Sequence, residues 1–271
     1  MPTSLSYPDV SVEIDGHIAT VEIQRPPHNF FDVALIRALG DAYHALDAEP
    51  EVRAIVLASE GRSFCAGAQL GGPAPGEATA PEDPATPAPP RTGSGHLYQE
   101  AIRLLEAETP VVAAVQGPAI GGGLGLALSA DFRVAAPEAR FAANFARLGF
   151  HHGFGLTVTL PALVGQQSAL DLLYTGRRVK GDEALALGLC DALVPAEELR
   201  PKAYAMAAEI ATSAPLAVRA IRRTMRRGLA ERVRQATDHE LVEQDWLRQT
   251  DDFREGVRAT AERRTPEFTG T

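Results

Sequence analysis

The sequence predicts an α/β fold for residues 1–195, followed by a helical C-terminal subdomain over residues 196–271. Two observations support this prediction. In the first part, short apolar segments alternate with segments of helical period, which implies mostly parallel strands. From Glu197 onward almost every segment favours a helix, with one break at Ser213-Ala214-Pro215. A chain of 271 residues is long enough to bury a sizeable core.

The N-terminal segment predicts a hairpin and a first helix. Residues 10–25 alternate apolar and polar around Asp15-Gly16, which is typical of two strands joined by a tight turn. Pro26-Pro27 ends the second strand. Apolar residues recur at helical spacing over 32–46, and residues 51–58 form an apolar run that suits a buried strand.

Residues 71–95 interrupt this alternation. The segment is rich in proline and contains no large apolar residue. Such a composition cannot bury enough surface to offset the entropy lost on ordering, so we expect a mobile, solvated insertion. The alternative is a lid that orders over a ligand. Helical signals resume over residues 96–106.

Residues 109–136 combine a strand, a glycine turn and a helix. Val111–Val115 is an apolar run that suits a strand buried on both faces, residues 116–123 form the turn, and residues 124–130 favour a helix. This order directs backbone N–H groups and a helix N-terminus at negative charge on a ligand. A tight turn without a ligand is the alternative.

Two common glycine motifs do not fit this turn. The dinucleotide motif would need a third glycine where Leu126 stands, and a phosphate loop would need a lysine that the turn lacks. Beyond the turn, we expect a loop-rich segment over 141–155, a helix over 160–173, and a strand, helix and strand over 175–194, with the helix ending at Gly188.

Composition disfavours several classes of protein. The net charge of −9 argues against a nucleic-acid partner. No apolar run approaches the length of a membrane span, and no secretory leader is recognisable, so we expect a cytoplasmic protein without a membrane partner. Cys65 and Cys190 are too few for a disulfide framework and are not spaced for zinc, so no metal site is expected.

Two segments resemble one known family. FCAGAQL at 64–70 and QGPAIGGGLGLALSADFRVA at 116–135 are similar to the two characteristic regions of the enoyl-CoA hydratase/isomerase (crotonase) superfamily. The similarity covers nearly the whole chain apart from the insertion. It implies a crotonase-like spiral of ββα units with a helical C-terminal trimerisation region, often assembled as a dimer of trimers. It also implies an acyl-CoA thioester as substrate, with no cofactor beyond the coenzyme A that the substrate carries.

The resemblance also implies site residues. The backbone N–H groups of Ala68 and Gly122 match those that stabilise a thioester enolate in the family. Other positions that match the substrate pocket are Ala66, Gln69, Leu70, Tyr98, Gly121, Asn144 and Phe145. For Tyr98 and Gln69, a structural role is the alternative to substrate binding. Phe145, Phe150 and Phe154 together suggest an apolar acyl pocket, with ordinary core packing as the alternative.

The chain departs from the hydratase pattern at both catalytic carboxylates. Hydratases of the family carry glutamates where this chain has Gly125 and Phe145. Without a general acid and base, water is not activated for addition in the usual way, so standard hydratase activity is not expected. His151 and His152 are the candidate replacements, and the alternative is that they bond local backbone groups or face solvent.

Three functional interpretations remain. The first is an enzyme of acyl-CoA thioesters, including an isomerase, decarboxylase or hydrolase that uses a loop histidine. The second is an acyl-CoA-binding protein without turnover. A serine hydrolase of similar fold is disfavoured because no serine lies in a nucleophile-elbow pattern.

Overall fold

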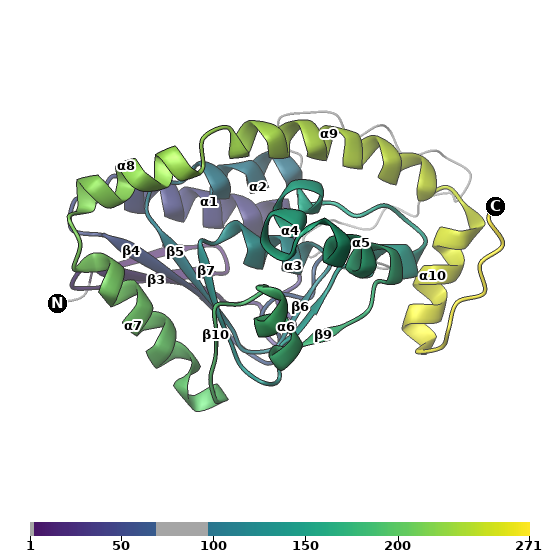
Figure 1. The fold of residues 1–271 in the computed structure, drawn as a ribbon, viewed down its shortest axis with the longest axis horizontal. Helices are drawn as coiled ribbons and strands as arrows, with labels where there is room; N and C mark the ends of the chain where they lie inside the picture. The colour runs from purple at the N-terminus through teal and green to yellow at the C-terminus, as the bar shows by residue number, and fades with distance from the viewer. Residues whose placement is uncertain (1–2, 69–96) are drawn as a thin grey trace.

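The computed structural model describes residues 3–68 and 97–271 (Figure 1). The proline-rich insertion over 71–95, with Gln69 and Leu70 before it, lies outside the described residues. The fold is mixed α/β with a large, mostly parallel sheet, as the alternation of strand and helix signals predicts.

The large sheet has seven strands in the order β1-β2-β3-β4-β5-β7-β10. The first three strands are antiparallel, and β3, β4, β5, β7 and β10 run parallel. Their bounds are β1 (Thr3–Tyr7), β2 (Val10–Asp15), β3 (Ile18–Ile23), β4 (Ala54–Ser59), β5 (Val111–Val115), β7 (Phe132–Ala135) and β10 (Ala192–Leu193). The hairpin around Asp15-Gly16 and the buried strand at Val111–Val115 are confirmed.

A smaller sheet of three strands contains β6 (Pro118–Ile120), β8 (Arg140–Ala142) and β9 (Val179–Lys180). The prediction that 116–123 is only a turn was therefore wrong, because Pro118–Ile120 pairs with β8. The prediction of a loop-rich segment over 141–155 was wrong at its start, where β8 and a 3₁₀ turn at Asn144–Leu148 lie. Strands this short leave no periodic signal in the sequence.

Six helices connect these strands: α1 (Val33–Asp47), α2 (Leu97–Glu106), α3 (Gly122–Ser129), α4 (Leu156–Val164), α5 (Gln166–Thr175) and α6 (Gly181–Leu187). Asp32 caps α1 by accepting a hydrogen bond from the Leu35 N–H at 2.8 Å. Two predicted boundaries were wrong. The helix α3 begins at Gly122 rather than at 124, and the helix expected over 160–173 is divided at Gly165, whose φ of +76° ends α4.

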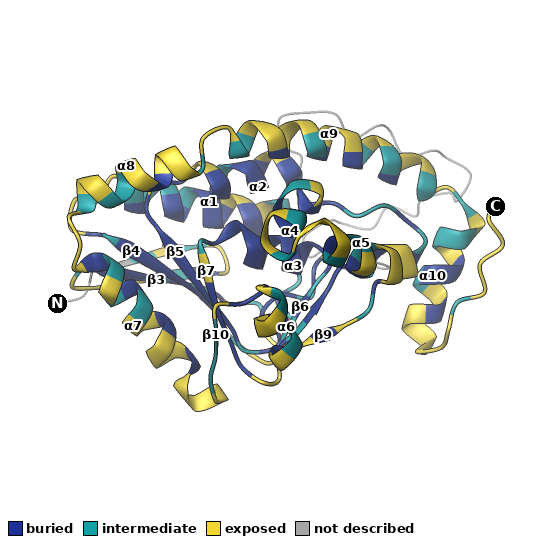
Figure 2. Cartoon of the chain, viewed as in Figure 1, coloured by how far each residue is buried: buried dark blue, intermediate teal, exposed yellow. Residues whose placement is uncertain are grey.

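The C-terminal helices cover two sides of the sheet. Ala203 and Ala207 of α7 (Leu199–Ala211) pack against Val56 and Val112 on one face. The helices α8 (Pro215–Met225) and α9 (Leu229–Leu247) run over the layer of α1 and α2, and α10 (Asp251–Glu262) turns down beside the 3₁₀ segment (Figure 1). Their outward faces are exposed (Figure 2).

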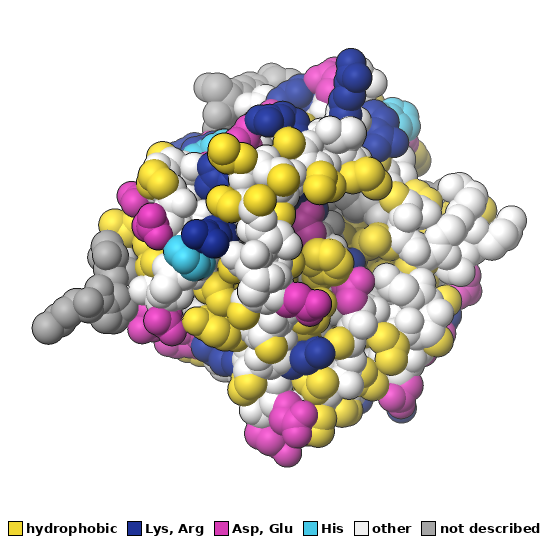
Figure 3. All heavy atoms as spheres, turned by 60° about the vertical axis from the view of Figure 1, so that its left-hand side comes forward, with side chains coloured by type: hydrophobic (Ala, Val, Ile, Leu, Met, Phe, Trp, Pro, Cys, Tyr) yellow, Lys and Arg dark blue, Asp and Glu magenta, His cyan; other side chains and the backbone are white. Residues whose placement is uncertain are grey.

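The surface is chemically mixed. Acidic, basic and apolar side chains are interspersed on the face shown in Figure 3. Among the described residues, no helix is long and apolar enough to cross a membrane.

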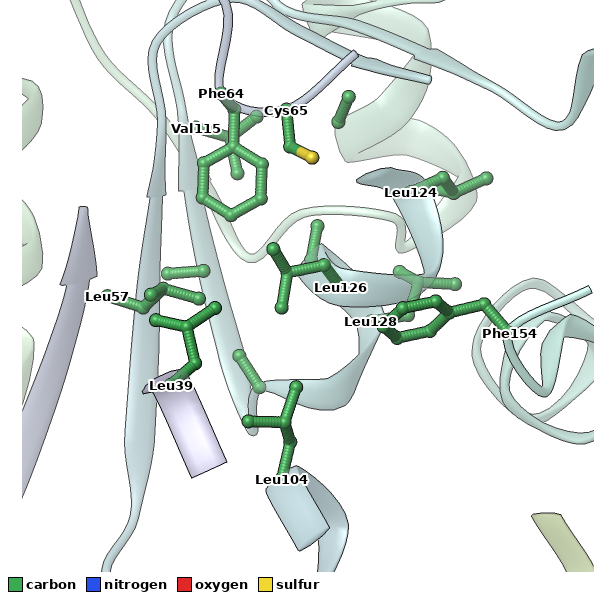
Figure 4. Close-up of a cluster of buried hydrophobic side chains, with 14 of the residues drawn as sticks. Leu39, Leu57, Phe64, Cys65, Leu104, Val115, Leu124, Leu126, Leu128 and Phe154 are labelled. Carbon is green, nitrogen blue, oxygen red and sulfur yellow. The ribbon is translucent and has the colours of Figure 1, made fainter. Parts of the chain in front are cut away.

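The main core lies between the large sheet and the helices α1 to α3. Leu39 of α1, Leu57 of β4 and Leu104 of α2 are fully buried there (Figure 4). Phe154 reaches into this core from the loop before α4 and points toward α3 (Figure 4). Each such side chain contributes about 1.5–3 kcal/mol when buried, and their packing fixes the position of α3 beneath the glycine turn.

Candidate functional site

The segment 64–68 lies alongside the glycine turn. The Cys65 N–H donates to the Pro118 carbonyl at 3.0 Å, and the Ile120 N–H donates to the Cys65 carbonyl at 3.0 Å. The backbones approach so closely that a Cβ at Gly123 would lie 2.0 Å from the Cys65 carbonyl oxygen. A side chain at this glycine would therefore force the two segments apart.

Two backbone N–H groups without a bonded acceptor lie on the segments that adjoin here. Gly121 has a φ of +57° and donates its N–H to the Ala142 carbonyl. The next residue, Gly122, is the first residue of α3. Among the described residues, no hydrogen bond takes up the N–H of Gly122 or of Ala68. A Cβ at Gly67 would lie 3.5 Å from the Gly122 nitrogen, so the residue before Ala68 adjoins the start of α3. The N-terminus of α3 adds a partial positive charge at this point.

Aromatic side chains and one amide surround the turn. A Cβ at Gly122 would lie 2.3 Å from Phe31 Cζ and 3.5 Å from Phe154 Cδ2. A Cβ at Gly121 would lie 3.3 Å from Asn144 Oδ1 and 3.6 Å from Phe145 Cζ. The structure thus brings the predicted residues Asn144 and Phe145 to the turn. It adds Phe31, which the sequence analysis missed.

Phe154 occupies the space beside Gly125, the first missing-glutamate position. A Cβ at Gly125 would lie 2.6 Å from Phe154 Cδ1, 2.7 Å from its Cβ and 2.8 Å from its Cγ. The ring is 5% exposed and packs against Phe31 with a centroid separation of 5.5 Å. An aromatic ring therefore fills the space that a glutamate side chain at position 125 would need.

His151 and His152 are held in defined tautomers by their partners. His151 Nδ1 lies 2.8 Å from the His152 carbonyl, which only accepts, so this nitrogen carries the proton. His152 Nε2 lies 2.9 Å from Thr157 Oγ1, and that hydroxyl donates to Glu240 Oε1 at 2.6 Å. The hydroxyl has a single proton, so it accepts from His152 Nε2–H and leaves His152 Nδ1 as the free acceptor.

Glu240 of α9 anchors this loop from outside it. Its carboxylate is fully buried and also accepts hydrogen bonds from the N–H groups of Gly155 at 2.9 Å and Thr157 at 3.1 Å. Burial raises the pKa of Glu240. Burial, together with the charge of His151, lowers the pKa of His152 to about 4, which outweighs the attraction of the Glu240 carboxylate at 3.8 Å. His152 is therefore neutral at pH 7.

Tyr98 supports the same loop from α2. Its hydroxyl bonds the Gln244 amide at 3.0–3.2 Å, and Gln244 donates to the His151 carbonyl at 3.0 Å. A Cβ at Gly153 would lie 1.8 Å from the Tyr98 hydroxyl oxygen, so only glycine allows this contact. Burial raises the pKa of Tyr98 to about 12, which keeps the phenol neutral.

The predicted residues therefore fall into distinct groups. Ala68, Gly121, Gly122, Asn144 and Phe145 lie at the turn. Ala66 is half-buried beside them, and Gln69 and Leu70 lie outside the described residues. The nearest side chains to Gly122 and Gly125 are phenylalanines rather than the two histidines, which pack with Glu240 and Gln244 of α9.

No sequence signal marks Glu240 or Gln244 as members of the site. The tertiary fold alone brings the middle of α9 to the loop before α4, 83–93 residues earlier in the chain.

Other reactive groups near the turn are few. Burial raises the pKa of Cys65 to about 12, so it remains a thiol and packs as a small apolar residue. Within residues 3–68 and 97–271, no cluster of three or more His, Cys, Asp or Glu side chains could hold a metal ion.

Comparison with known proteins gives consistent matches along the chain. The family model described as enoyl-CoA hydratase/isomerase matches residues 13–271. A crotonyl-CoA hydratase from Syntrophomonas wolfei is 33% identical over 97% of this chain and 99% of its own length. An enoyl-CoA hydratase from Mycobacterium tuberculosis is 32% identical over 99% of each chain. The crystal structure of an enoyl-CoA hydratase/isomerase from Pseudoalteromonas atlantica superposes with a TM-score of 0.82 and 29% identity, covering 97% of this chain and 100% of that one.

Proposed function

This chain belongs to the enoyl-CoA hydratase/isomerase family, and we propose that it is an enzyme that binds an acyl-CoA thioester and stabilises the thioester enolate with the N–H groups of Ala68 and Gly122. The observation that supports the proposal is the close approach of the two segments that carry these N–H groups, neither of which has a hydrogen-bond acceptor among the described residues. A glycine in each segment has no room for a side chain, because a Cβ at Gly67 would lie 2.8 Å from the Ile120 carbonyl oxygen and a Cβ at Gly122 would lie 2.3 Å from Phe31 Cζ.

The chemistry of an enolate explains this arrangement. When a proton or a carboxyl group leaves the carbon next to the thioester, negative charge moves to the thioester oxygen. Fixed N–H donors stabilise such a charge by about 3–4 kcal/mol each where a bound substrate excludes water from them. They need no reorientation, because the hydrogen bonds of Cys65 and Ile120 already fix both backbones. Coenzyme A enters as part of the substrate, and the proposed reaction needs no other cofactor.

The proposed reaction is not hydration by two carboxylates. Gly125 and Phe145 carry no acid or base, and Phe154 fills the space beside Gly125. The remaining candidates for proton transfer are His151 and His152. The tautomer held by Thr157 makes His152 a proton acceptor at neutral pH. We therefore propose an isomerase or decarboxylase that forms an enolate, or a hydrolase that forms a tetrahedral oxyanion at the same donors, with a loop histidine that transfers the proton.

A binding protein without turnover is the second candidate. The predominance of aromatic rings around Gly122 and Gly125 favours it, because such a site retains the donors for the thioester oxygen but offers few groups for proton transfer.

Titration and turnover together separate these functions. Calorimetry with acetyl-CoA and crotonyl-CoA should give binding, and mass spectrometry after incubation with enoyl-, dienoyl-, malonyl- and aryl-CoA thioesters should identify a product. Binding without any product would favour the second candidate. The absence of both heat and a thermal shift at millimolar thioester would contradict the proposed function altogether.

We further propose that the chain assembles as a homotrimer or as a dimer of trimers, as members of the family often do. The exposed face of α8 supports this, since Leu216, Ile221 and Met225 are 81%, 62% and 80% exposed. A group of exposed apolar side chains on one helix is a feature of protein–protein contact surfaces. Light scattering that reports a monomer would refute the proposal.

A further inference from the structure

We infer that Phe154 determines the length of the acyl chain that this site accepts, and that its ring restricts the site to short acyl groups. The inference rests on the proposed binding of an acyl-CoA thioester. It concerns the end of the pocket beyond the thioester carbonyl, where the ring of Phe154 lies against the glycine turn.

The backbone of Phe154 has an unusual conformation for its residue type. Its φ is +62°, in the left-handed region that bulky side chains rarely adopt. Such a conformation persists only where the surroundings impose it. Here the Glu240 carboxylate holds the N–H of the next residue, Gly155, and the Tyr98 hydroxyl packs against the preceding Gly153. The loop is thereby fixed on both sides of Phe154, with its ring directed inward.

The ring lies beside the turn to which the thioester is proposed to bind. Its Cδ2 would lie 3.5 Å from a Cβ at Gly122, the residue whose N–H is proposed to bind the thioester oxygen. The ring also contacts Phe31 and meets Tyr98 edge-on at a centroid separation of 6.3 Å. The carbons that follow the carbonyl therefore meet an aromatic wall after a short distance.

A small space lies on another side of the same ring. Phe154 and Gly125 line a cavity of about 10 Å³ together with residues of α2, α3, α4 and α9. The hydroxyls in its wall belong to Ser129, Thr159 and Thr237, and each donates to a backbone carbonyl. With these groups satisfied, the cavity suits hydrocarbon. Removing the ring would join its volume to this cavity and open an apolar path toward α9.

The experiment compares short and long thioesters on the whole 271-residue chain. Phe154→Gly removes the ring and suits the left-handed backbone. Calorimetric titration with butyryl-CoA and decanoyl-CoA should show that the wild-type protein prefers the shorter chain. In Phe154→Gly, the affinity for decanoyl-CoA relative to butyryl-CoA should rise by about tenfold or more, because each additional methylene buried contributes to binding.

Two further variants make the result specific. Phe253→Ala removes an aromatic ring of α10 that packs on Phe150 at a centroid separation of 5.2 Å, and it should leave the chain-length preference unchanged. Phe154→Leu retains an apolar side chain if the glycine variant unfolds, and should give an intermediate preference.

The outcomes separate the role of Phe154 from the proposed binding of acyl-CoA thioesters. If butyryl-CoA binds but the decanoyl-to-butyryl ratio is the same in the wild-type protein and the Phe154 variants, the role of Phe154 is refuted and the proposed function stands. If neither thioester binds the wild-type protein, the proposed function fails and the inference fails with it.

Discussion

The effect of Gly125→Ala on stability should change sign with the residue at position 154. Gly125 lies within α3, where alanine is normally preferred over glycine by about 1 kcal/mol. In the wild-type protein, however, the new methyl group would lie 2.6–2.8 Å from three atoms of Phe154. One of them is the Phe154 Cβ, which cannot move without the backbone.

The expected magnitudes follow from these contacts. Overpacking a buried site typically costs about 1–3 kcal/mol, so the gain in helix propensity is cancelled or exceeded. We expect Gly125→Ala to lower the free energy of unfolding by up to about 2 kcal/mol in the wild-type protein. In a Phe154→Gly background the clash is absent, and the same substitution should stabilise by about 1 kcal/mol. The coupling between the two sites should therefore be about 1–3 kcal/mol.

Urea denaturation of the four proteins of this cycle, followed by circular dichroism at one protein concentration, measures the coupling. Gly40→Ala is the matched control, because Gly40 lies within α1 and a Cβ there would meet Arg103 atoms at an ordinary 3.4 Å. It should be additive with Phe154→Gly. If Gly125→Ala stabilises the wild-type protein, or if its effect is the same in both backgrounds, then Phe154 does not occupy the space beside Gly125.

Three other predictions concern chemistry and the loop before α4. Crotonyl-CoA hydration should be several orders of magnitude slower than in a hydratase with both glutamates, since each acid or base contributes about 10²–10⁴-fold; fast hydration that survives a His151→Ala, His152→Ala double substitution would contradict this. The pKa of His152 is about 4 in the folded protein and about 6.5 when unfolded, so its contribution to stability is complete above pH 6.5 and is lost as the pH falls toward 4, by up to about 3 kcal/mol. The raised pKa of Glu240 opposes this loss. The contribution of His152 is therefore measured by comparing the urea midpoints of the wild-type protein and His152→Gln between pH 7 and pH 4.5. An identical pH dependence of the two proteins would refute the predicted contribution of His152. Glu240→Ala should lower the free energy of unfolding by about 2–5 kcal/mol, because it leaves the N–H groups of Gly155 and Thr157 without their acceptor, and a loss below about 1 kcal/mol would show that the loop is held by other contacts.

The sequence alone predicted the hairpin over 10–25, several strands of the large sheet, several helices, and the family. Strands such as Val111–Val115 and helices such as α1 are set by local periodicity, which neighbouring residues carry together. The glycines of the turn also have a local signature, because close backbone approach excludes side chains. The resemblance also predicted that Gly125 and Phe145 stand where hydratases of the family carry glutamates. These features depend on residues that are near one another in the chain.

The sequence did not predict the smaller sheet or the break at Gly165. The strand β6 exists because Pro118–Ile120 meets β8 and the segment around Cys65, and three residues have no period of their own. The start of α3 and the end of α4 depend on the positive φ angles of Gly121 and Gly165, and the sequence around a glycine is compatible with several kinds of turn.

The immediate surroundings of the glycine turn were decided by tertiary structure. Phe154 was recognised as one of several aromatic residues, but its place beside Gly125 follows from a left-handed backbone that Glu240 holds from 85 residues away along the chain. The tautomer of His152 depends on Thr157 and on that same carboxylate. A hydrogen bond between distant segments leaves no periodic trace in either one, because each residue is compatible with many neighbours until the fold selects one of them.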